Sequence, residues 1–274
     1  MNRSSLVLLW CVSTAALISW PGLKASGESA LRLSLPEKYG TINANTYDED
    51  GNAVGDARLV IATDKDGNTV LEGEAGITLS ASTTYSIVLE PTKHSKLKPL
   101  LQKSHSIDVE GNSLGMLTIN HVKGFASCSS SESDPKKKIR TLKLPSNDLV
   151  SNIPLSLLFR PLVEGKKKEI SFQIFLCRPK PRLIHANAKV VRSKKNAEGI
   201  VEVQYTISLG NLLNRVASPF LPKLSVWFDP KIPNMWIGHR VPLYTQGPTV
   251  TILRLGNHLK EIGVKQKLGR DRKF

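Results

Sequence analysis

The sequence predicts an all-β protein, with a small antiparallel β-sandwich followed by a curved antiparallel sheet or half-barrel. Three observations support this class. Short runs of alternating apolar and polar residues recur along the 274-residue chain, turn signals separate them, and amphipathic helical patterns are scarce. The 19 Gly and 16 Pro residues interrupt helices and mark turns. A chain of this length can bury two small cores or one large β core.

The first element along the chain is an export-like N-terminus. Arg3 supplies a positive charge, Leu6 to Trp20 is nearly free of polar residues, and small residues follow as far as Gly27. This order is typical of a secretory signal peptide, so we expect residues 1–27 to be removed. A retained membrane anchor is the alternative, but the apolar run is shorter than the roughly 20 residues that span a bilayer. We therefore expect an exported protein, either periplasmic or extracellular.

Residues 28–123 form the predicted first domain, an acidic β-sandwich of short strands. Strand-like runs at Thr41–Thr46 and Ala57–Ala62 are followed by the segments Asp48–Asn52 and Asp64–Asn68, which both read D-x-D-G-N. Calcium binding is one interpretation of these carboxylates, but the remaining ligand positions of an EF-hand loop are missing. Asp-Gly is also a preferred hairpin turn, so we interpret both segments as turns.

Several motifs of this domain occur in the order of a known type of β-sandwich. They are Gly40-Thr-Ile-Asn43, Asp50-Gly-Asn-Ala-Val54, Ala57-Arg-Leu-Val-Ile61, Asp66-Gly-Asn-Thr69 and Ser82-Thr-Thr-Tyr85-Ser-Ile-Val-Leu89. The segment resembles the transthyretin-like or carboxypeptidase-regulatory sandwich. That resemblance implies a scaffold or interaction module and no reaction.

Residues 124–135 are rich in serine and are the predicted linker. The charge balance reverses at this point. Residues 28–126 carry 9 Lys and Arg against 13 Asp and Glu, whereas residues 127–274 carry 27 against 10. Such a split indicates two modules, of which the second faces an anionic partner.

Residues 136–256 form the predicted second domain, a basic antiparallel β domain, and residues 257–274 form a basic tail. The clearest strand runs from Val201 to Leu209, where apolar and polar residues alternate strictly. Similar runs begin at Ile170, Ile184, Leu224 and Val250. Their short connections predict a meander that curves into a sheet or open barrel.

The apolar segment Leu149 to Val163 does not fit a strand, because Pro154 and Pro161 interrupt it. It could plug the open end of the sheet, or it could form a mobile lid over an apolar ligand cavity. We favour the plug.

Four stretches of the second domain occur in a familiar order: Pro161–Gly165, Trp227–Pro230, Pro233–Arg240 and Val250–Leu255. The domain resembles periplasmic domains of unknown function with a half-barrel similar to that of lipoprotein carriers. The resemblance implies an envelope-resident, barrel-like fold that could bind lipid. It implies no catalytic residue.

Two cysteines remain once the signal peptide is removed. Cys128 and Cys177 could pair in an oxidising compartment, and two unpaired thiols are the alternative. Both possibilities stay open at this level.

The basic residues of the second domain occur in clusters. Those expected to bind an anionic surface are Lys136, Lys137, Lys138, Lys166, Lys167, Lys168, Arg192, Lys194 and Lys195. Each basic residue near an anionic surface contributes about 1 kcal/mol, an effect that salt screens. Anionic lipid, lipopolysaccharide or cell-wall polymer fit this chemistry, and a solvated basic surface is the plainer interpretation. Nucleic acid does not fit, because the clusters lack interleaved aromatic residues for base stacking.

No motif indicates catalysis. Gly111–Gly115 matches G-x-S-x-G, but a nucleophile elbow needs a following helix and a strand is expected there. None of the six histidines has a His, Cys or Glu at metal-ligand spacing, so we expect no metal and no cofactor. The sequence therefore predicts a non-enzymatic, exported cell-envelope protein that binds an anionic or lipidic ligand through the basic domain. The alternative is a structural or interaction protein of the envelope, which has an envelope protein as partner and no small-molecule ligand.

Overall fold

The computed structural model describes residues 33–34, 40–92, 96–130, 139–145, 150, 152, 155–177, 180–191, 197–208, 224–231, 235–244 and 247–264. The predicted signal peptide, residues 1–27, lies outside this set. Within the set, no helix is long and apolar enough to cross a membrane.

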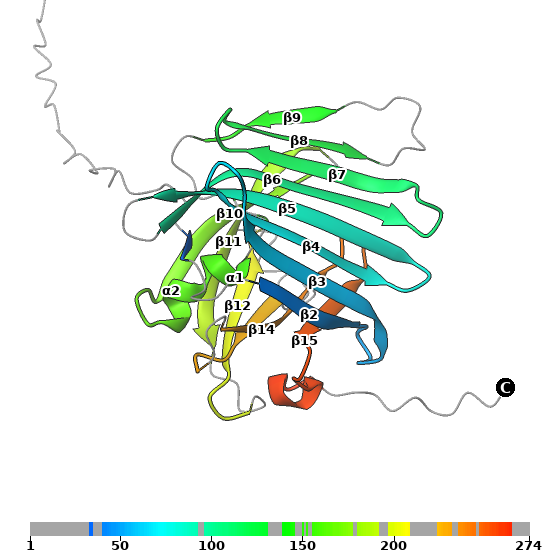
Figure 1. The fold of residues 1–274 in the computed structure, drawn as a ribbon, viewed down its shortest axis with the longest axis vertical. Helices are drawn as coiled ribbons and strands as arrows, with labels where there is room; N and C mark the ends of the chain where they lie inside the picture. Colours follow the sequence, from blue (N-terminus) through cyan, green and yellow to red (C-terminus); the bar gives the residue numbers. More distant parts are fainter. Residues whose placement is uncertain are drawn as a thin grey trace, which may run out of the picture.

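Among the described residues, fifteen strands form one antiparallel sheet, which confirms the all-β class (Figure 1). The strands in its first half are β1 (Leu33–Ser34), β2 (Gly40–Tyr47), β3 (Ala53–Thr63), β4 (Thr69–Ile77), β5 (Ala81–Thr92), β6 (Lys96–Asp108), β7 (Ser113–Asn120), β8 (Phe125–Ser130) and β9 (Arg140–Lys143). Those in its second half are β10 (Glu169–Leu176), β11 (Arg182–Val191), β12 (Val201–Ile207), β13 (Leu224–Phe228), β14 (Trp236–Pro242) and β15 (Thr249–Arg254). The spatial order runs from β10 to β15, then from β2 to β9, with β1 beside β6.

The two predicted sets of strands belong to the same sheet. The last strand, β15, pairs with β2 in the register Thr251↔Tyr47 to Arg254↔Ala44. The strands that the sequence assigned to a separate sandwich are therefore one half of a single sheet. This pairing joins residues about 200 positions apart, which no local pattern encodes.

The serine-rich segment also differs from its expected role as a linker. Its residues 125–130 form β8, which pairs with β7 and β9. Ala126 and Cys128 are buried, and the residues between and beside them are partly exposed. Small residues that alternate between buried and partly exposed positions are enough to form a strand here. The prediction of a linker from the serine content of this segment is therefore wrong for residues 125–130.

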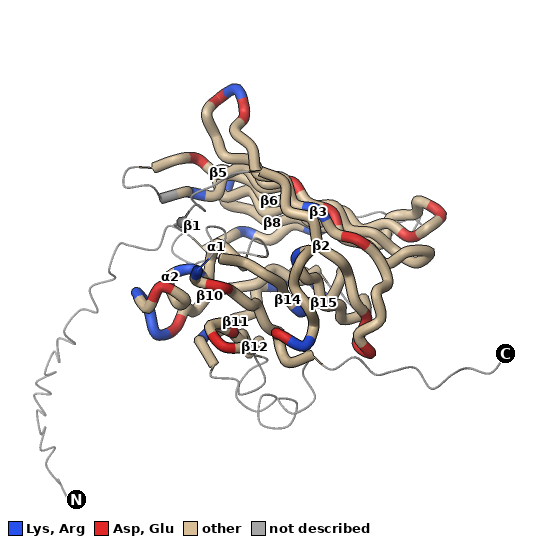
Figure 2. The backbone as a smooth tube through the Cα atoms, turned by 60° about the horizontal axis from the view of Figure 1, so that its bottom comes forward, with Lys and Arg blue, Asp and Glu red and all other residues tan. Residues whose placement is uncertain are grey.

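Two short helices lie between the halves of the sheet (Figures 1 and 2). They are α1 (Leu155–Leu158) and α2 (Arg160–Val163), and they come from the interrupted apolar segment. Leu157 and Leu158 of α1, Leu162 of α2 and Phe159 between the helices belong to the main core. That core also contains residues from both halves of the sheet. The ring of Phe159 lies 5.6 Å from that of Phe172 and 5.7 Å from that of Tyr205. This is the arrangement that the plug interpretation expects.

A separate core cluster forms at the end of the described chain. The 3-10 helix η2 (Leu259–Ile262) contributes Leu259 and Ile262 to a cluster with Trp227, Ile237 and Leu253. Trp227 is 3% exposed and Trp236 is 8% exposed, so both tryptophans are packing residues.

Candidate functional site

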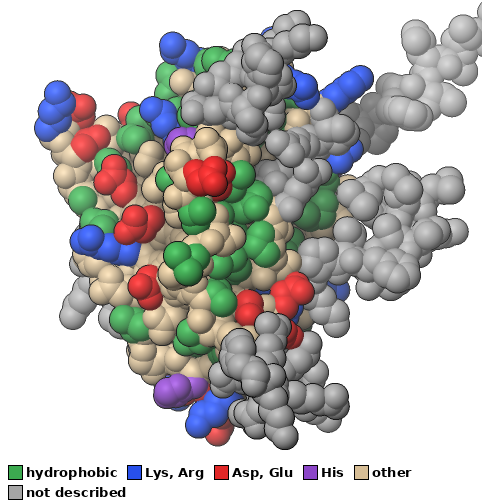
Figure 3. Space-filling view, turned by 90° about the vertical axis from the view of Figure 1, so that its right-hand side faces the viewer, with side chains coloured by type: hydrophobic (Ala, Val, Ile, Leu, Met, Phe, Trp, Pro, Cys, Tyr) green, Lys and Arg blue, Asp and Glu red, His purple; other side chains and the backbone are tan. Residues whose placement is uncertain are grey.

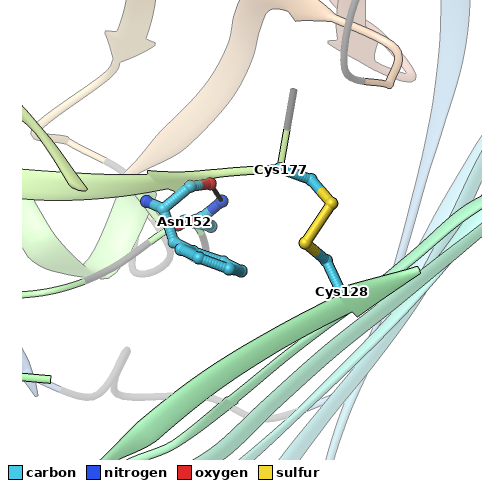
Figure 4. The surroundings of a disulfide bond; sticks show 4 residues. Cys128, Asn152 and Cys177 are labelled. Atoms are coloured by element: carbon cyan, nitrogen blue, oxygen red, sulfur yellow. Dashed lines mark hydrogen bonds between the residues drawn. A yellow bond between two sulfur atoms is a disulfide. The ribbon is translucent and has the colours of Figure 1, made fainter. Parts of the chain in front are cut away.

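A disulfide connects the two halves of the sheet near its ends. Cys128, on β8, is bonded to Cys177, which directly follows β10, with a Cα–Cα distance of 6.0 Å (Figure 4). The paired alternative is thus the one that the structure adopts. The bond closes a loop between positions 49 apart in the sequence, and this loop contains α1 and α2.

Asn152 makes a second connection beside the disulfide (Figure 4). The Phe175 N–H donates to Asn152 Oδ1 at 2.8 Å, and Asn152 Nδ2 donates to the Phe175 carbonyl at 2.8 Å. The Asn152 backbone N–H donates to Gln102 Oε1 on β6 at 3.2 Å. One side chain therefore takes the place of a neighbouring strand at the edge of β10. Nothing in the sequence indicated this role.

Gln102 extends the connection into the first half of the sheet. It is fully buried, and its Nε2 lies 2.9 Å from Nε2 of His121. Burial lowers the pKa of His121 to about 4, so the ring is neutral near pH 7. A neutral ring nitrogen can accept from the Gln102 amide, which leaves Gln102 Oε1 to accept from Asn152.

Of the basic residues predicted to bind an anionic surface, the structure describes the three on the turn between α2 and β10. Lys166, Lys167 and Lys168 are all exposed there. Lys166 Nζ lies 2.8 Å from Glu164 Oε2, and the Lys167 N–H donates to the Pro161 carbonyl at 3.0 Å. Figure 2 shows basic and acidic residues together at this turn beside α2. We call Lys166–Lys168 the basic turn.

The structure does not describe the other predicted binding residues. Lys136, Lys137, Lys138, Arg192, Lys194 and Lys195 lie outside the described residues. The register Glu169↔Lys189 puts the start of β10 and the end of β11 at the same end of the sheet. The basic turn therefore lies at the end where β11 stops at Val191.

The G-x-S-x-G motif forms a hairpin and the start of a strand. Gly111 and Asn112 belong to the turn before β7, so no helix follows Ser113. Ser113 Oγ lies 3.1 Å from His105 Nε2, but Ser113 is only 3% exposed. A serine this buried is out of a substrate's reach, and the pair is interpreted as a packing hydrogen bond.

The three D-x-[DE]-G-N segments are matching hairpin turns. In each, the first Asp accepts from the backbone N–H groups two and four residues ahead and from the Asn side chain: Asp48–Asn52, Asp64–Asn68 and Asp108–Asn112. Gly51, Gly67 and Gly111 have φ of 84°, 80° and 83°. The carboxylates are therefore used within the turns, and the third copy went unrecognised in the sequence because Glu110 replaces the second Asp.

An open groove of about 490 Å³ crosses the strands β3 to β7. Its border includes Arg58, Glu72, Glu74, Lys103 and Met116, so charges of both signs face it. The face with the β4–β5 and β6–β7 hairpins likewise mixes hydrophobic and acidic side chains (Figure 3). Neither surface is uniformly basic, and neither carries three consecutive exposed lysines as the basic turn does.

Comparisons with known proteins do not identify a family. No family model matches the chain, and no curated protein matches it. Among solved structures, the chain is similar to a β-barrel-like protein of the domain of unknown function DUF1849 from Brucella abortus, at 8% identity and a TM-score of 0.45. The match covers 81% of this chain and 97% of that one. These findings support neither the transthyretin-like nor the lipoprotein-carrier-like resemblance.

Proposed function

We propose that this is a non-enzymatic, exported protein of the cell envelope that binds an anionic ligand on its surface through the basic turn. The observation that carries the proposal is the exposure of three consecutive lysines on a turn between two ordered elements. Glu164 is ion-paired with Lys166, and the described residues include no ion pair of Lys167 or Lys168. Two ammonium groups therefore remain available to an anion.

Export is supported by two independent features. The N-terminal sequence has the order of charge, apolar run and small residues that signal peptides share. Cys128 and Cys177 are disulfide-bonded, and stable disulfides are found mainly in oxidising compartments such as the periplasm and the cell exterior.

Surface binding fits the structure better than an enclosed lipid. Phe159 is fully buried, and Phe172 and Tyr205 are 2% and 4% exposed around it. The space between the halves of the sheet is thus occupied by the chain's own side chains. A lipid would have to displace α1 and α2 and lose their burial.

Co-sedimentation with vesicles tests the proposal. The full-length mature protein should bind phosphatidylglycerol vesicles but not phosphatidylcholine vesicles, and binding should fall steeply between 50 and 300 mM salt because the attraction is electrostatic. The Lys166→Glu, Lys167→Glu, Lys168→Glu variant should lose roughly tenfold or more in affinity.

A matched control has the same charge change elsewhere. Lys65, Lys103 and Lys123 are exposed lysines of the first half of the sheet, and their replacement by Glu should have a much smaller effect. An equal loss of vesicle affinity in the two triple variants would show that net charge, and not the basic turn, determines binding, and would contradict the proposal. Absent or salt-independent binding would sink it.

One observation favours the alternative, an envelope interaction protein. Leu79 is 90% exposed at the β4–β5 hairpin and has a φ of 61°, and Val109 is 62% exposed at the β6–β7 hairpin. If these tips contact a partner protein, wild type should retain a stoichiometric envelope protein that the Leu79→Asp, Val109→Asp variant does not. Equal retention by both would exclude the tips as the interface.

A further inference from the structure

The outward face of β3 to β7 presents two rows of side chains that include charged residues. Residues directly opposite each other in antiparallel strands point to the same face of the sheet. The registers of β3 to β7 therefore give one outward row of Val60, Glu72, Ser86, Lys103 and Thr118, and beside it a second row of Arg58, Glu74, Thr84, His105 and Met116. We call these the charged rows, and both line the open groove of about 490 Å³.

A third outward row, beside that of Glu72, is mostly apolar. The registers align Ala62, Val70, Val88, Leu101 and Asn120 from β3 to β7. Val70, Val88 and Leu101 are half-buried, and no core cluster of the described residues includes them. All three rows lie within the described ranges 40–92 and 96–130. A contiguous apolar strip on the outward face of a sheet, bordered by polar residues, is typical of a surface that packs on another protein.

The charges of the charged rows change sign across β5, which is the middle strand between β2 and β8 (Figure 1). Glu72 and Glu74 lie on β4, on one side of β5, whereas Lys103 and His105 lie on β6, on its other side. No ion pair among the described residues involves Glu72, Glu74 or Lys103. Glu72 and Lys103 are two strands apart, about 10 Å, so they do not pair within one chain.

A two-fold axis parallel to β5 makes this face complementary to itself. Rotation about such an axis brings β4 of a second copy over β6 and keeps each row over the same row. Glu72 of one copy then faces Lys103 of the other, and Glu74 faces His105. A two-fold axis across the strands would instead place the acidic strand β4 over itself, which like-charge repulsion disfavours.

The apolar row and the area of the face fit the same axis. Val88 then faces its own copy and Val70 faces Leu101, so the apolar row is buried against itself. Strands lie about 4.8 Å apart and residues of one face about 6.8 Å apart along a strand, so three rows from β2 to β8 cover about 700 Å². Specific interfaces bury about 800 Å² per partner. Sheets pack face to face about 10 Å apart, a gap that facing Glu and Lys side chains span together.

We propose that the outward face of β3 to β7 binds a second copy of this chain, in a two-fold symmetric dimer with β5 on the axis. The inference goes beyond the proposed function and uses a different surface. The basic turn precedes β10, in the second half of the sheet, so each protomer keeps its own basic turn whether or not the dimer forms.

Charge reversal tests the facing pair. Glu72→Lys puts two ammonium groups against each other at both symmetric contacts, and Lys103→Glu does the same with carboxylates. Each variant alone should dimerise at least about a hundredfold more weakly than the wild type in sedimentation equilibrium. An equimolar mixture of the two variants should form a heterodimer, because both contacts are attractive again. Lys65→Glu, at the exposed β3–β4 hairpin, is the matched control and should stay a dimer.

Recovery in the mixture also shows that both variants are folded. A wild type that stays monomeric at high micromolar concentration would overturn the inference. A dimer that both single variants still form, or a mixture that stays monomeric while the wild type dimerises, would overturn it as well, because the pairing of Glu72 with Lys103 would then be absent.

Cysteine cross-linking tests the position of the axis. Cys128 and Cys177 are bonded to each other, so one introduced cysteine is the single free thiol of a protein that lacks residues 1–27. Thr84 on β5 faces its own copy across the axis, so a short bismaleimide should link Thr84→Cys protomers but not Lys65→Cys protomers. Equal cross-linking of the two variants would contradict an axis at β5.

The vesicle assay keeps the dimer and the proposed function apart. The Lys166→Glu, Lys167→Glu, Lys168→Glu variant should lose vesicle binding and remain a dimer, whereas the control variant that contains Lys103→Glu should be a monomer that still binds vesicles. A monomeric wild type that binds phosphatidylglycerol vesicles would reject the dimer alone. A dimeric wild type that does not bind them would reject the proposed function alone.

Discussion

At the scale of single residues, short-range hydrogen bonds determine the hairpins. The carboxylate of Asp64 accepts from the Asn68 side chain and from two backbone N–H groups, and these bonds lower its pKa below the ordinary 3.8. The pKa of Asp108 is lowered in the same way, chiefly by the Asn112 side chain. For Asp48 partial burial opposes the shift, but the hydrogen bonds from Asn52, Asp50 and Gly51 together outweigh it and lower the pKa.

These shifts predict the acid stability of the protein. A carboxyl whose folded pKa is depressed contributes stability above its unfolded pKa and loses it as pH falls through the folded pKa. The melting temperature of the wild type should therefore decrease as the pH is lowered below about 4. In the Asp48→Asn, Asp64→Asn, Asp108→Asn variant the melting temperature should depend less on pH over the same range. Calorimetry between pH 7 and pH 2 measures this. Parallel profiles for the two proteins would contradict it.

Asn152 should matter for stability more than its sequence context indicates. Asn152→Ala leaves the N–H and C=O of the fully buried Phe175 without partners, which should cost about 2 to 4 kcal/mol in the free energy of unfolding. Asn187→Ala, which removes one exposed side-chain contact, should cost less than about 1 kcal/mol. Urea denaturation compares the two, and similar losses would mean that Asn152 does not hold the edge of β10.

At the scale of elements, alternation located most strands but not their partners. The run predicted at Val201–Leu209 is β12 as far as Ile207. Val203 and Tyr205 are buried as the alternation predicts, but Glu202, which the alternation puts on the other face, is buried too, at 6% exposed. The interrupted apolar segment was recognised as neither strand nor long helix, and it forms α1 and α2. Composition failed for β8, where small residues replace the usual branched ones.

The plug can be tested at its central ring. Phe159→Ala should lower the free energy of unfolding by about 3 to 5 kcal/mol, because the ring is fully buried against Phe172 and Tyr205. The exposed Leu79→Ala variant should change stability by less than about 0.5 kcal/mol. A small loss for Phe159→Ala would indicate that α1 and α2 can leave the sheet at little cost, as a mobile lid requires.

At the scale of the whole molecule, the pairing of β15 with β2 and the disulfide make one unit from two predicted domains. Because the main core contains residues from both halves, we expect the full chain to unfold in a single calorimetric transition. Two resolved transitions, one assigned to each half, would show that the halves unfold independently.

The disulfide between Cys128 and Cys177 should contribute substantially to the stability of the folded chain. A bond that closes a loop of this length restricts the unfolded chain by about 4 kcal/mol, so Cys128→Ser, Cys177→Ser should lower the melting temperature by roughly 8 to 16 °C. The reduced wild type should behave like the variant, which differential scanning calorimetry can check. A wild type unaffected by reduction would mean that the bond does not hold the halves together.

The sequence by itself determined the all-β class, the hairpin turns and most strand positions, because alternation and turn chemistry act between residues near in the chain. Only the tertiary structure decided that the strands form one sheet, that Cys128 meets Cys177, and that Asn152 completes the edge of β10. Each of these contacts depends on how a long chain closes on itself, and the loss of chain entropy on closure is offset by the burial of a shared core rather than by any local signal.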